Sequence, residues 1–341
     1  MSKIKIGMAG VCNAGQLAKV FQYSKRAQIV ALWDIDAQLL AQAKTDPALE
    51  AAQCYAEFDA FLGSDMDAVI FGTPGDVRTA QVIQALKAGK HVFNQGAMAH
   101  TVEDCFAIYE TVKTTGMQYM LAENYVYLDF IGQWKKYVAD GRIGNIHYAE
   151  AEYVQNLGDT SENVEAALQM SSHCIGPMLY LMGDDRIVKV TAWGKSGSNA
   201  CGIQTALFET EQGRILKVLG SQTAKRDPKL VSYAVFGTTG SLETGRTPGL
   251  DTMGQRFFEG SDSGFIPMYC GSTKLDADLA MKKLSDTATA EYAAAETFLD
   301  AVEGNAEPVL NAERAVAITV PGILARQAAA EGYIWLDVPH I

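Results

Sequence analysis

The sequence lacks any apolar run approaching the roughly 20 residues that a membrane-spanning helix needs. It also lacks Cys-x-x-Cys pairs and His/Cys clusters, and its six cysteines are scattered along the chain. The first residues lack the apolar segment of a secretory signal and go straight into a strand-like pattern. These absences predict a cytoplasmic protein with reduced thiols, without a disulfide framework, a metal site or a membrane anchor.

Positive charge is also scarce, because 28 Lys and Arg residues stand against 40 Asp and Glu residues. The formal net charge of −12 disfavours nucleic acid as a partner, since a phosphate backbone would be repelled. It disfavours docking on anionic lipid for the same reason. The acidic residues are spread along the chain, so we interpret the charge as a solubility feature.

Apolar residues are plentiful, at 48% of a 341-residue chain, which indicates a folded protein of two domains. Strand and helix patterns alternate over the first 120 residues, as a parallel sheet requires. We expect strands at 3–8, 28–33, 68–72, 91–94 and 118–121, and helices at 16–23, 36–43, 78–88 and 102–114. The first domain is therefore predicted to span residues 1–121.

The pattern changes after about residue 122, where strands become dominant. We expect strands at 146–155, 188–193, 203–209, 215–222, 230–236 and 334–338, and helices at 125–139, 164–182, 287–302 and 312–330. Turn sequences at 211–213 and 237–240 suggest hairpins, and residues 245–285 are interpreted as a loop or lid. The predicted class is α/β, with a parallel sheet first. An α+β domain over 122–341 follows, built on a large, mostly antiparallel open sheet, and its final helix and strand can return towards the first domain.

A glycine-containing turn, Gly10–Gly15, follows the first expected strand and opens a helix. In a dinucleotide-binding turn the first glycine makes the tight turn and the second admits the pyrophosphate. The third lets the helix pack on the strand. Gly10 and Gly15 hold the outer places here, whereas Cys12 holds the middle one.

An acidic residue stands at the place where such a site needs one. Asp34 closes the second expected strand, 19 residues after Gly15, where a carboxylate would accept the hydroxyls of the adenosine ribose. Asp36 adds a second negative charge that would repel a 2′-phosphate, so NAD is favoured over NADP. A tight strand-to-helix turn with no ligand is the alternative.

The order of these motifs resembles the Gfo/Idh/MocA family, named after glucose–fructose oxidoreductase and inositol dehydrogenase. The resemblance is carried by Gly10-x-x-x-x-Gly15, Asp34, Asp67–Pro74, Ala85–Phe93, Asp140–Ile146 and Pro321–Ala325. It implies a Rossmann domain, an open-sheet domain, and NAD-dependent chemistry on a hydroxyl of a sugar, glycoside or polyol. It also implies homodimers or homotetramers formed through the exposed face of the second sheet.

The resemblance also implies which residues surround the cofactor. These are Gly10, Cys12, Asn13, Ala14, Gly15, Asp34, Thr73, Pro74, Arg78, Asn94 and Gln95. Arg78, which replaces the family's histidine, could pair with a cofactor phosphate or simply stand in solvent. Most members read Glu-Lys-Pro where this chain reads Asn94-Gln95-Gly96, and Gln95 cannot carry a proton at neutral pH.

Oxidation of a hydroxyl requires a base for its proton, and His173 is the candidate, in the position of the family's catalytic histidine. Gln169 replaces the aspartate usual four residues before it. A buried histidine satisfied by a backbone carbonyl is the alternative. Residues expected to position the substrate are Gln95, Glu123, Asn124 and Tyr127, although 123–127 could also be a joining segment with packed tyrosines.

Two further carboxylates, Glu150 and Glu152, alternate with alanine on an expected strand and are interpreted as solvated. A metal site that combines them with His173 is disfavoured, because no spacing demands it.

The sequence therefore predicts an NAD-dependent oxidoreductase that acts on a sugar, glycoside or polyol hydroxyl. The first alternative is a redox-neutral enzyme of the glycosidase, epimerase or lyase type that holds NAD tightly, which the missing lysine favours. The second is a catalytically silent homologue that kept the fold.

Overall fold

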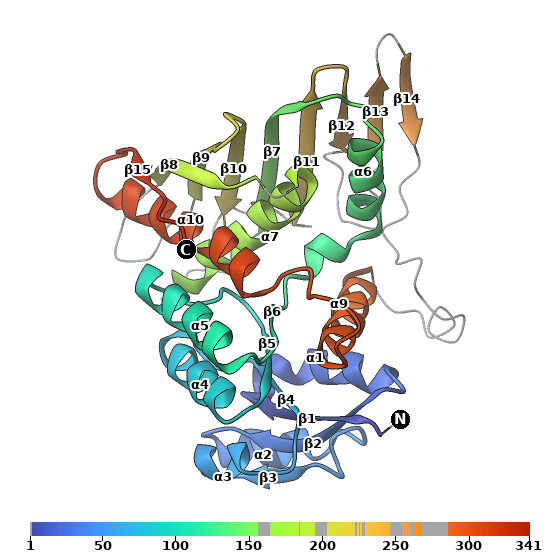
Figure 1. Ribbon diagram of the computed structural model, residues 1–341, viewed down its shortest axis with the longest axis vertical. Coiled ribbons are helices and arrows are strands. Elements are labelled where there is room, and N and C mark those ends of the chain that lie inside the picture. Colours follow the sequence, from blue (N-terminus) through green and yellow to red (C-terminus); the bar gives the residue numbers. More distant parts are fainter. Residues whose placement is uncertain are drawn as a thin grey trace. The chain divides into compact units, whose positions relative to one another are not determined.

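The computed structural model describes residues 2–155, 164–183, 185–194, 203–221, 224, 226, 229–245, 255–259, 262–266 and 286–341. The chain forms two compact units (Figure 1). Among the described residues, the first unit holds 2–123 and 291–316, and the second holds the remainder. The first unit thus includes a segment from near the carboxyl end of the chain, in addition to the 1–121 expected from the sequence.

The first unit is built on a parallel sheet with the strand order β3-β2-β1-β4-β5-β6. The strands are β1 (Ile4–Ala9), β2 (Ala27–Trp33), β3 (Gln53–Tyr55), β4 (Ala68–Phe71), β5 (His91–Asn94) and β6 (Tyr119–Leu121). Strands β4 and β6 are buried throughout, because helices cover both faces, and so they read in the sequence as short unbroken apolar runs. The predicted Rossmann-type sheet is confirmed.

The helices that connect consecutive strands are α1 (Val11–Tyr23), α2 (Ala37–Ala43), α3 (Phe58–Leu62), α4 (Gly75–Lys87) and α5 (Val102–Thr115). From residue 291 onward, α9 (Asp286–Val302) also belongs to this unit. Neither β3 nor α3 is predicted from the sequence. Two of the three β3 residues are exposed and α3 has only five residues, so neither leaves a periodic apolar pattern.

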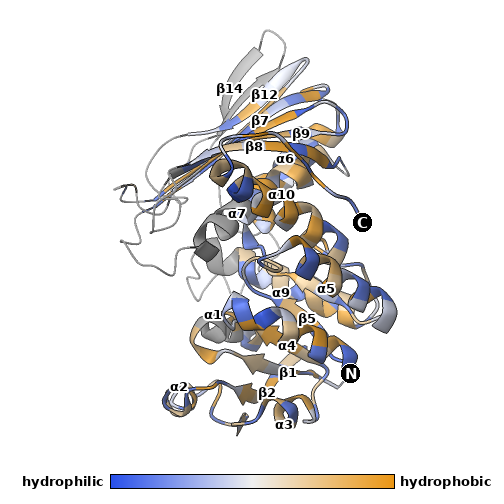
Figure 2. Ribbon diagram, turned by 90° about the vertical axis from the view of Figure 1, so that its left-hand side faces the viewer, coloured by the Kyte–Doolittle hydropathy of each residue, from blue (hydrophilic) through white to orange (hydrophobic). Residues whose placement is uncertain are grey.

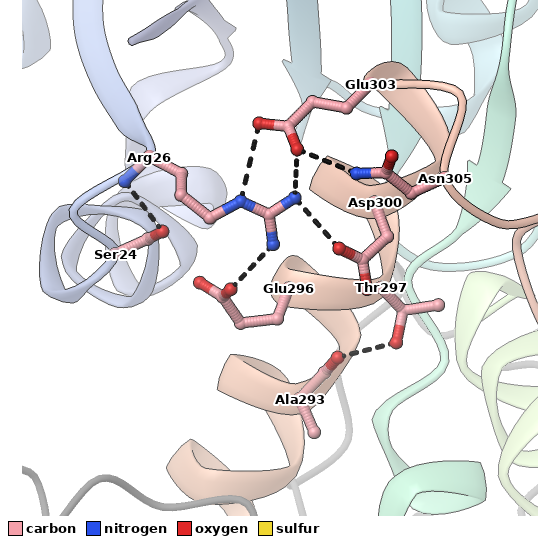
Figure 3. A network of polar contacts seen from close by, with 8 residues as sticks. All are labelled: Ser24, Arg26, Ala293, Glu296, Thr297, Asp300, Glu303 and Asn305. Atoms are coloured by element: carbon pink, nitrogen blue, oxygen red, sulfur yellow. Dashed lines mark hydrogen bonds and ion pairs between the residues drawn. The ribbon is translucent and has the colours of Figure 1, made fainter. Parts of the chain in front are cut away.

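Arg26 fastens α9 to the start of β2 (Figure 3). Its guanidinium lies 3.0 Å from Glu296, 2.8 Å from Asp300 and 2.7 Å from Glu303. Burial disfavours the charged guanidinium, but hydrogen bonds and charges from the three carboxylates outweigh that cost and raise the pKa of Arg26. Phe298 of the same helix is fully buried among aromatic rings of the first unit. The late segment is therefore part of the core of this unit.

His91 occupies the start of β5 as a neutral hydrogen-bond acceptor. Its Nδ1 accepts the backbone N–H of Gln118 at 2.9 Å. Burial lowers the pKa of His91 from its ordinary 6.5, and the charge of Asp67 only partly opposes this. Below pH 6.5 the unfolded chain therefore binds this proton more readily than the native state does, so stability is lost as pH falls.

We expect His91→Asn to flatten the decline of the free energy of unfolding between about pH 7 and pH 5. The asparagine oxygen can accept the Gln118 N–H in place of Nδ1, but it does not titrate. Urea unfolding at a series of pH values measures the effect. Parallel profiles for the two proteins would contradict it.

The second unit is built on a sheet whose described strands run β14-β13-β12-β11-β7-β10-β9-β8-β15. They are β7 (Ile146–Val154), β8 (Ile187–Gly194), β9 (Ile203–Thr210), β10 (Ile215–Ser221), β11 (Leu230–Gly237), β12 (Gly240–Thr244), β13 (Gln255–Glu259), β14 (Asp262–Ile266) and β15 (Leu336–Asp337). Only the β7–β10 pair is parallel among these, which confirms the mostly antiparallel sheet.

The interpretation of 245–285 as loop or lid is wrong over β13 and β14, which extend this sheet by antiparallel pairing. Each has only five residues, and Gly264 interrupts the second, so their sequences show no sustained alternation. The other residues of that segment, from 246 onward, lie outside the described residues.

Helices of the second unit are η1 (Asn124–Tyr127, a 3-10 turn), α6 (Asp129–Ala139), α7 (Val164–Met182) and, from residue 317, α10 (Ala312–Ala330). The single helix expected over 125–139 is wrong at its start, because Leu128 adopts an extended backbone that separates η1 from α6. Figure 2 shows α6 and α7 on one side of the sheet, and α7 packs on β7 and β10. None of the described helices is long and apolar enough to cross a bilayer.

The other face of this sheet exposes large apolar side chains. Trp193 on β8 is 54% exposed and Leu207 on the neighbouring β9 is 37% exposed. This is the face through which the family resemblance implies that subunits associate.

Candidate functional site

The turn after β1 is made by one residue, Gly10. It adopts a left-handed backbone with φ of 82°, and α1 begins directly after it at Val11. The helix therefore starts five residues earlier than the sequence suggested. A Cβ at Gly10 would stand 2.7 Å from the backbone of both Gly72 and Thr73. Only glycine fits where the ends of β1 and β4 meet, which is the switch point at which such sheets bind ligands.

Asp34, at the end of β2, is fixed against the first turn of α1. One carboxylate oxygen accepts the backbone N–H of Val11 at 2.9 Å, and the other accepts that of Asp36 at 3.0 Å. Each oxygen retains a second lone pair, so the carboxylate can still accept two ribose hydroxyls. Asp36 caps α2 by accepting the backbone N–H of Gln38 at 2.7 Å.

The remaining glycine-motif residues lie in the helix itself. Cys12 is exposed in the first turn of α1. Asn13, Ala14 and Gly15 follow in the same helix. The backbone N–H groups at this helix start favour a negatively charged group such as a phosphate.

Three buried side-chain oxygens at the carboxyl ends of β4 and β5 have no hydrogen-bond partner within the described part of the chain. They are Thr73 Oγ1, Asn94 Oδ1 and Gln95 Oε1. Buried polar atoms are nearly always paired in folded proteins, so these three indicate a place for a polar ligand. With Gly10 and Asp34 at the same sheet edge, the residues present fit a dinucleotide.

Arg78 on α4 is buried, and its Nη1 donates to the backbone carbonyl of Gln95. The alternative that it stands in solvent is therefore wrong. Asn94 holds the same loop, because its Nδ2 donates to the Ala97 carbonyl at 3.2 Å and to the Tyr119 hydroxyl at 3.0 Å. Burial raises the pKa of Tyr119, so its phenol stays protonated. Pro74, next to Thr73, is exposed at the start of α4.

In the second unit, His173 lies on α7 between two tyrosine rings. The centroid of its ring is 4.4 Å from that of Tyr125 and 5.1 Å from that of Tyr153. Its backbone carbonyl accepts the hydroxyl of Tyr233 at 2.7 Å, and the residue is only partly buried. The helix is thus tied to β11 through its backbone, and the imidazole is held in place by aromatic faces.

A lysine side chain adds a positive charge beside the rings of Tyr125 and Tyr153. Lys229, immediately before β11, donates from Nζ to the Tyr125 hydroxyl at 2.9 Å. The same nitrogen lies 5.7 Å from the ring centroid of Tyr125 and 5.5 Å from that of Tyr153. Neither Lys229 nor Tyr153 is among the site residues predicted from the sequence. The alternation of Lys229, Val231 and Tyr233 places them on one face of β11, but the partners on that face are not readable from the sequence.

The other residues predicted to position the substrate lie in η1 or directly before it. Glu123 is buried at the end of the first unit, while Asn124 and Tyr127 lie in η1 and are partly exposed. The 3-10 turn directs Tyr125 and Tyr127 to different sides, as a helical segment would. Tyr125, which the sequence left between a substrate role and packing, is the one that contacts His173.

The interpretation of Glu152 as solvated is wrong, because it is buried and accepts the hydroxyl of Ser232 at 2.9 Å. Glu150 is partly exposed and pairs with Lys217 at 3.2 Å. Burial raises the pKa of the Tyr148 phenol, and so does its hydrogen bond to Glu150. Among the described residues, no three His, Cys, Asp or Glu side chains gather in a group that could hold a metal ion.

Two models of one family match the chain. "Oxidoreductase family, NAD-binding Rossmann fold" matches residues 4–123, and "GFO/IDH/MocA C-terminal domain" matches residues 131–243. Together they take in more than half of the sequence. The protein belongs to the Gfo/Idh/MocA family of oxidoreductases.

Individual relatives are distant. A glycosyl hydrolase family 109 protein of Shewanella pealeana is 28% identical over 166 residues, which are 46% of this chain but only 36% of that protein. A levoglucosan dehydrogenase of Pseudarthrobacter phenanthrenivorans is 26% identical over 289 residues, covering 71% of this chain and 73% of the relative. The solved structure of a levoglucosan dehydrogenase with NADH and levoglucosan shares the fold. Its TM-score is 0.86 at 18% identity, over 99% of this chain and 100% of the other.

Proposed function

We propose that this protein is an NAD-dependent oxidoreductase that acts on a hydroxyl group of a sugar, glycoside or polyol. The observation that carries the proposal is the Asp34 carboxylate, which backbone N–H groups fix against the start of α1. Gly10 and Asp34 would hold the adenosine ribose and its phosphate. Thr73, Asn94 and Gln95 would contribute their unpaired oxygens to the cofactor or substrate. A dehydrogenase relative whose structure holds NADH and levoglucosan supports both ligand classes.

In this proposal His173 accepts the proton of the reacting hydroxyl, while the bound nicotinamide supplies a hydride acceptor. Tyr125 and Tyr153 fix the plane of the imidazole, and Gln95, Glu123, Asn124 and Tyr127 orient the substrate. Arg78 holds the Gln95 loop through the hydrogen bond from its Nη1 to the Gln95 carbonyl, and pairing of its guanidinium with a cofactor phosphate stays a prediction.

The direct test compares Asp34→Asn with Asp36→Asn by titration calorimetry on protein stripped of nucleotide. Loss of the Asp34 charge removes two charge-assisted bonds to the ribose, so we expect NAD⁺ affinity to fall by about 10- to 100-fold. Asp36→Asn keeps an N-cap oxygen and serves as the matched control, with NAD⁺ affinity within about twofold of wild type. A wild-type protein that binds neither NAD⁺ nor NADH would overturn the proposal.

A redox-neutral reaction is a second candidate, because glycosyl hydrolase family 109 proteins are among the relatives, matching 46% of this chain, and Gln95 stands where a lysine is usual. In that case the hydride would return to the product within one turnover. Cleavage of a nitrophenyl glycoside without accumulation of NADH would favour this candidate, whereas a rise in absorbance at 340 nm favours net oxidation.

A further inference from the structure

Lys229 belongs to the face of the second sheet that carries α7. Alternate residues of a strand share a face, so Lys229 lies on the same side as Tyr233, whose hydroxyl binds the backbone of His173. Across the β7–β11 pair, Val231 stands opposite Tyr153, which places Tyr153 on this face as well. Strand register thus delivers a lysine and a tyrosine from two strands to the helix that holds His173.

The contacts bring the charge of Lys229 close to the imidazole. Its ammonium is bonded to the Tyr125 hydroxyl, and the rings of Tyr125 and Tyr153 touch both Lys229 and His173. Lysine and histidine therefore share the same two aromatic neighbours. Both are partly exposed, whereas the two tyrosines are buried. The two buried tyrosines therefore support the side chains of His173 and Lys229, which are the residues that a substrate can reach.

An ammonium is a compact donor of three hydrogen bonds that points positive charge at an oxygen. The oxygen of a hydroxyl that is losing its proton develops negative charge, and a preorganised donor stabilises that charge far more than it stabilises the neutral hydroxyl. The amide of Gln95 cannot supply such a charge. The ammonium of Lys229, beside the ring of Tyr125, carries such a charge.

We propose that Lys229 is a catalytic residue that binds the oxygen of the reacting hydroxyl and stabilises its negative charge. The proposal rests on the proposed function. The O–H bond breaks and its proton passes to the imidazole of His173. The oxygen electron pair forms the C=O bond as the C–H bond breaks, and the hydride leaves to NAD⁺, which is the oxidant. Lys229 remains an ammonium throughout, and Tyr125 is a positioning residue that acts through it.

The kinetic test compares Lys229→Met with Lys217→Met, using NAD⁺ with levoglucosan, myo-inositol and glucose as probes. Lys217 is the matched control, because it is a lysine of the same sheet that pairs with Glu150. We expect Lys229→Met to lower kcat about 100-fold with little change in KM, and Lys217→Met to stay within about twofold of wild type. In a Lys229→Cys protein, aminoethylation rebuilds a lysine analogue and should restore kcat, with aminoethylated wild type as the control. A rise in KM alone, or an unchanged kcat, would overturn the catalytic role.

A second measurement needs neither cofactor nor substrate. In an ultraviolet titration of the tyrosines, Lys229→Met should move the ionisation of one phenol to higher pH, because its cationic partner is gone. In Tyr125→Phe that phenol should be missing from the titration. Identical tyrosine titration curves for wild type and Lys229→Met would refute the pairing of the Lys229 ammonium with the Tyr125 hydroxyl. If wild type oxidises none of the three probes, the proposed function fails for those substrates, and the titration still decides whether the ammonium and the phenol are coupled.

Discussion

Replacement of His173 by asparagine is expected to lower kcat by about 10³-fold while NAD⁺ affinity stays within about twofold of wild type, because the variant loses only the proton acceptor. Asparagine keeps a polar side chain of similar size, and Tyr233 still binds the backbone carbonyl at position 173. The helix therefore keeps its anchor, and the loss isolates the imidazole. Stopped-flow absorbance at 340 nm measures the rate of nicotinamide reduction directly.

His147→Asn is the matched control for this experiment. His147 is exposed on β7, the strand that also carries Tyr153, but it contributes to a different part of the surface. We expect its kcat to equal that of wild type. A His173→Asn protein that is as active as the His147→Asn control would refute the acid/base role and favour a histidine that merely packs between tyrosines.

Gly10→Ala should lower the free energy of unfolding by about 2–4 kcal/mol and abolish measurable NAD⁺ binding. The alanine would carry two penalties, a left-handed backbone and a Cβ placed 2.7 Å from the backbone of Gly72 and Thr73. Relief of the clash requires the ends of β1 and β4 to separate. That movement displaces the start of α1 from Asp34, which destroys the cofactor cradle together with the packing.

Gly116→Ala separates the two penalties. Gly116 ends α5 with φ of 69°, and a Cβ there would meet nothing within 4 Å. We expect it to cost only about 1–2 kcal/mol, the penalty of the left-handed backbone, and to leave NAD⁺ affinity intact. Urea unfolding and calorimetry of both variants provide the comparison. Equal losses of stability would show that contact with the β4 turn is not what constrains Gly10.

The sequence was sufficient wherever burial imposes a repeating pattern. Strands β4 and β5 and helices α7 and α10 were predicted to within one residue or better, since buried strands and amphipathic helices leave apolar runs or periodic repeats. Asp34 could be predicted because Gly10 and Asp34 directly follow β1 and β2. These strands are parallel neighbours, so both residues lie at the same end of the sheet.

The sequence was insufficient wherever pairing across the chain decides the outcome. Lys229 and Tyr125 are 104 residues apart, and their contact joins the residue before β11 to η1, which no local pattern encodes. The burial of Glu152 has the same origin, because its partner Ser232 comes from the opposite strand. The alternative that Arg78 stands in solvent was wrong because its side chain is buried through a hydrogen bond to the Gln95 carbonyl. The sequence does not show that this acceptor lies nearby.

The carboxylates of α9 that pair with Arg26 are synthesised much later than the strands of the first unit. A ribosome completes all six strands of this sheet long before it reaches residue 296, yet Phe298 is buried against rings of the first unit and Glu296 pairs with Arg26. We therefore expect the first unit to complete its hydrophobic core only after almost the whole polypeptide has been made. A fusion protein that borrows the first unit is therefore expected to fold stably only if α9 is included with it.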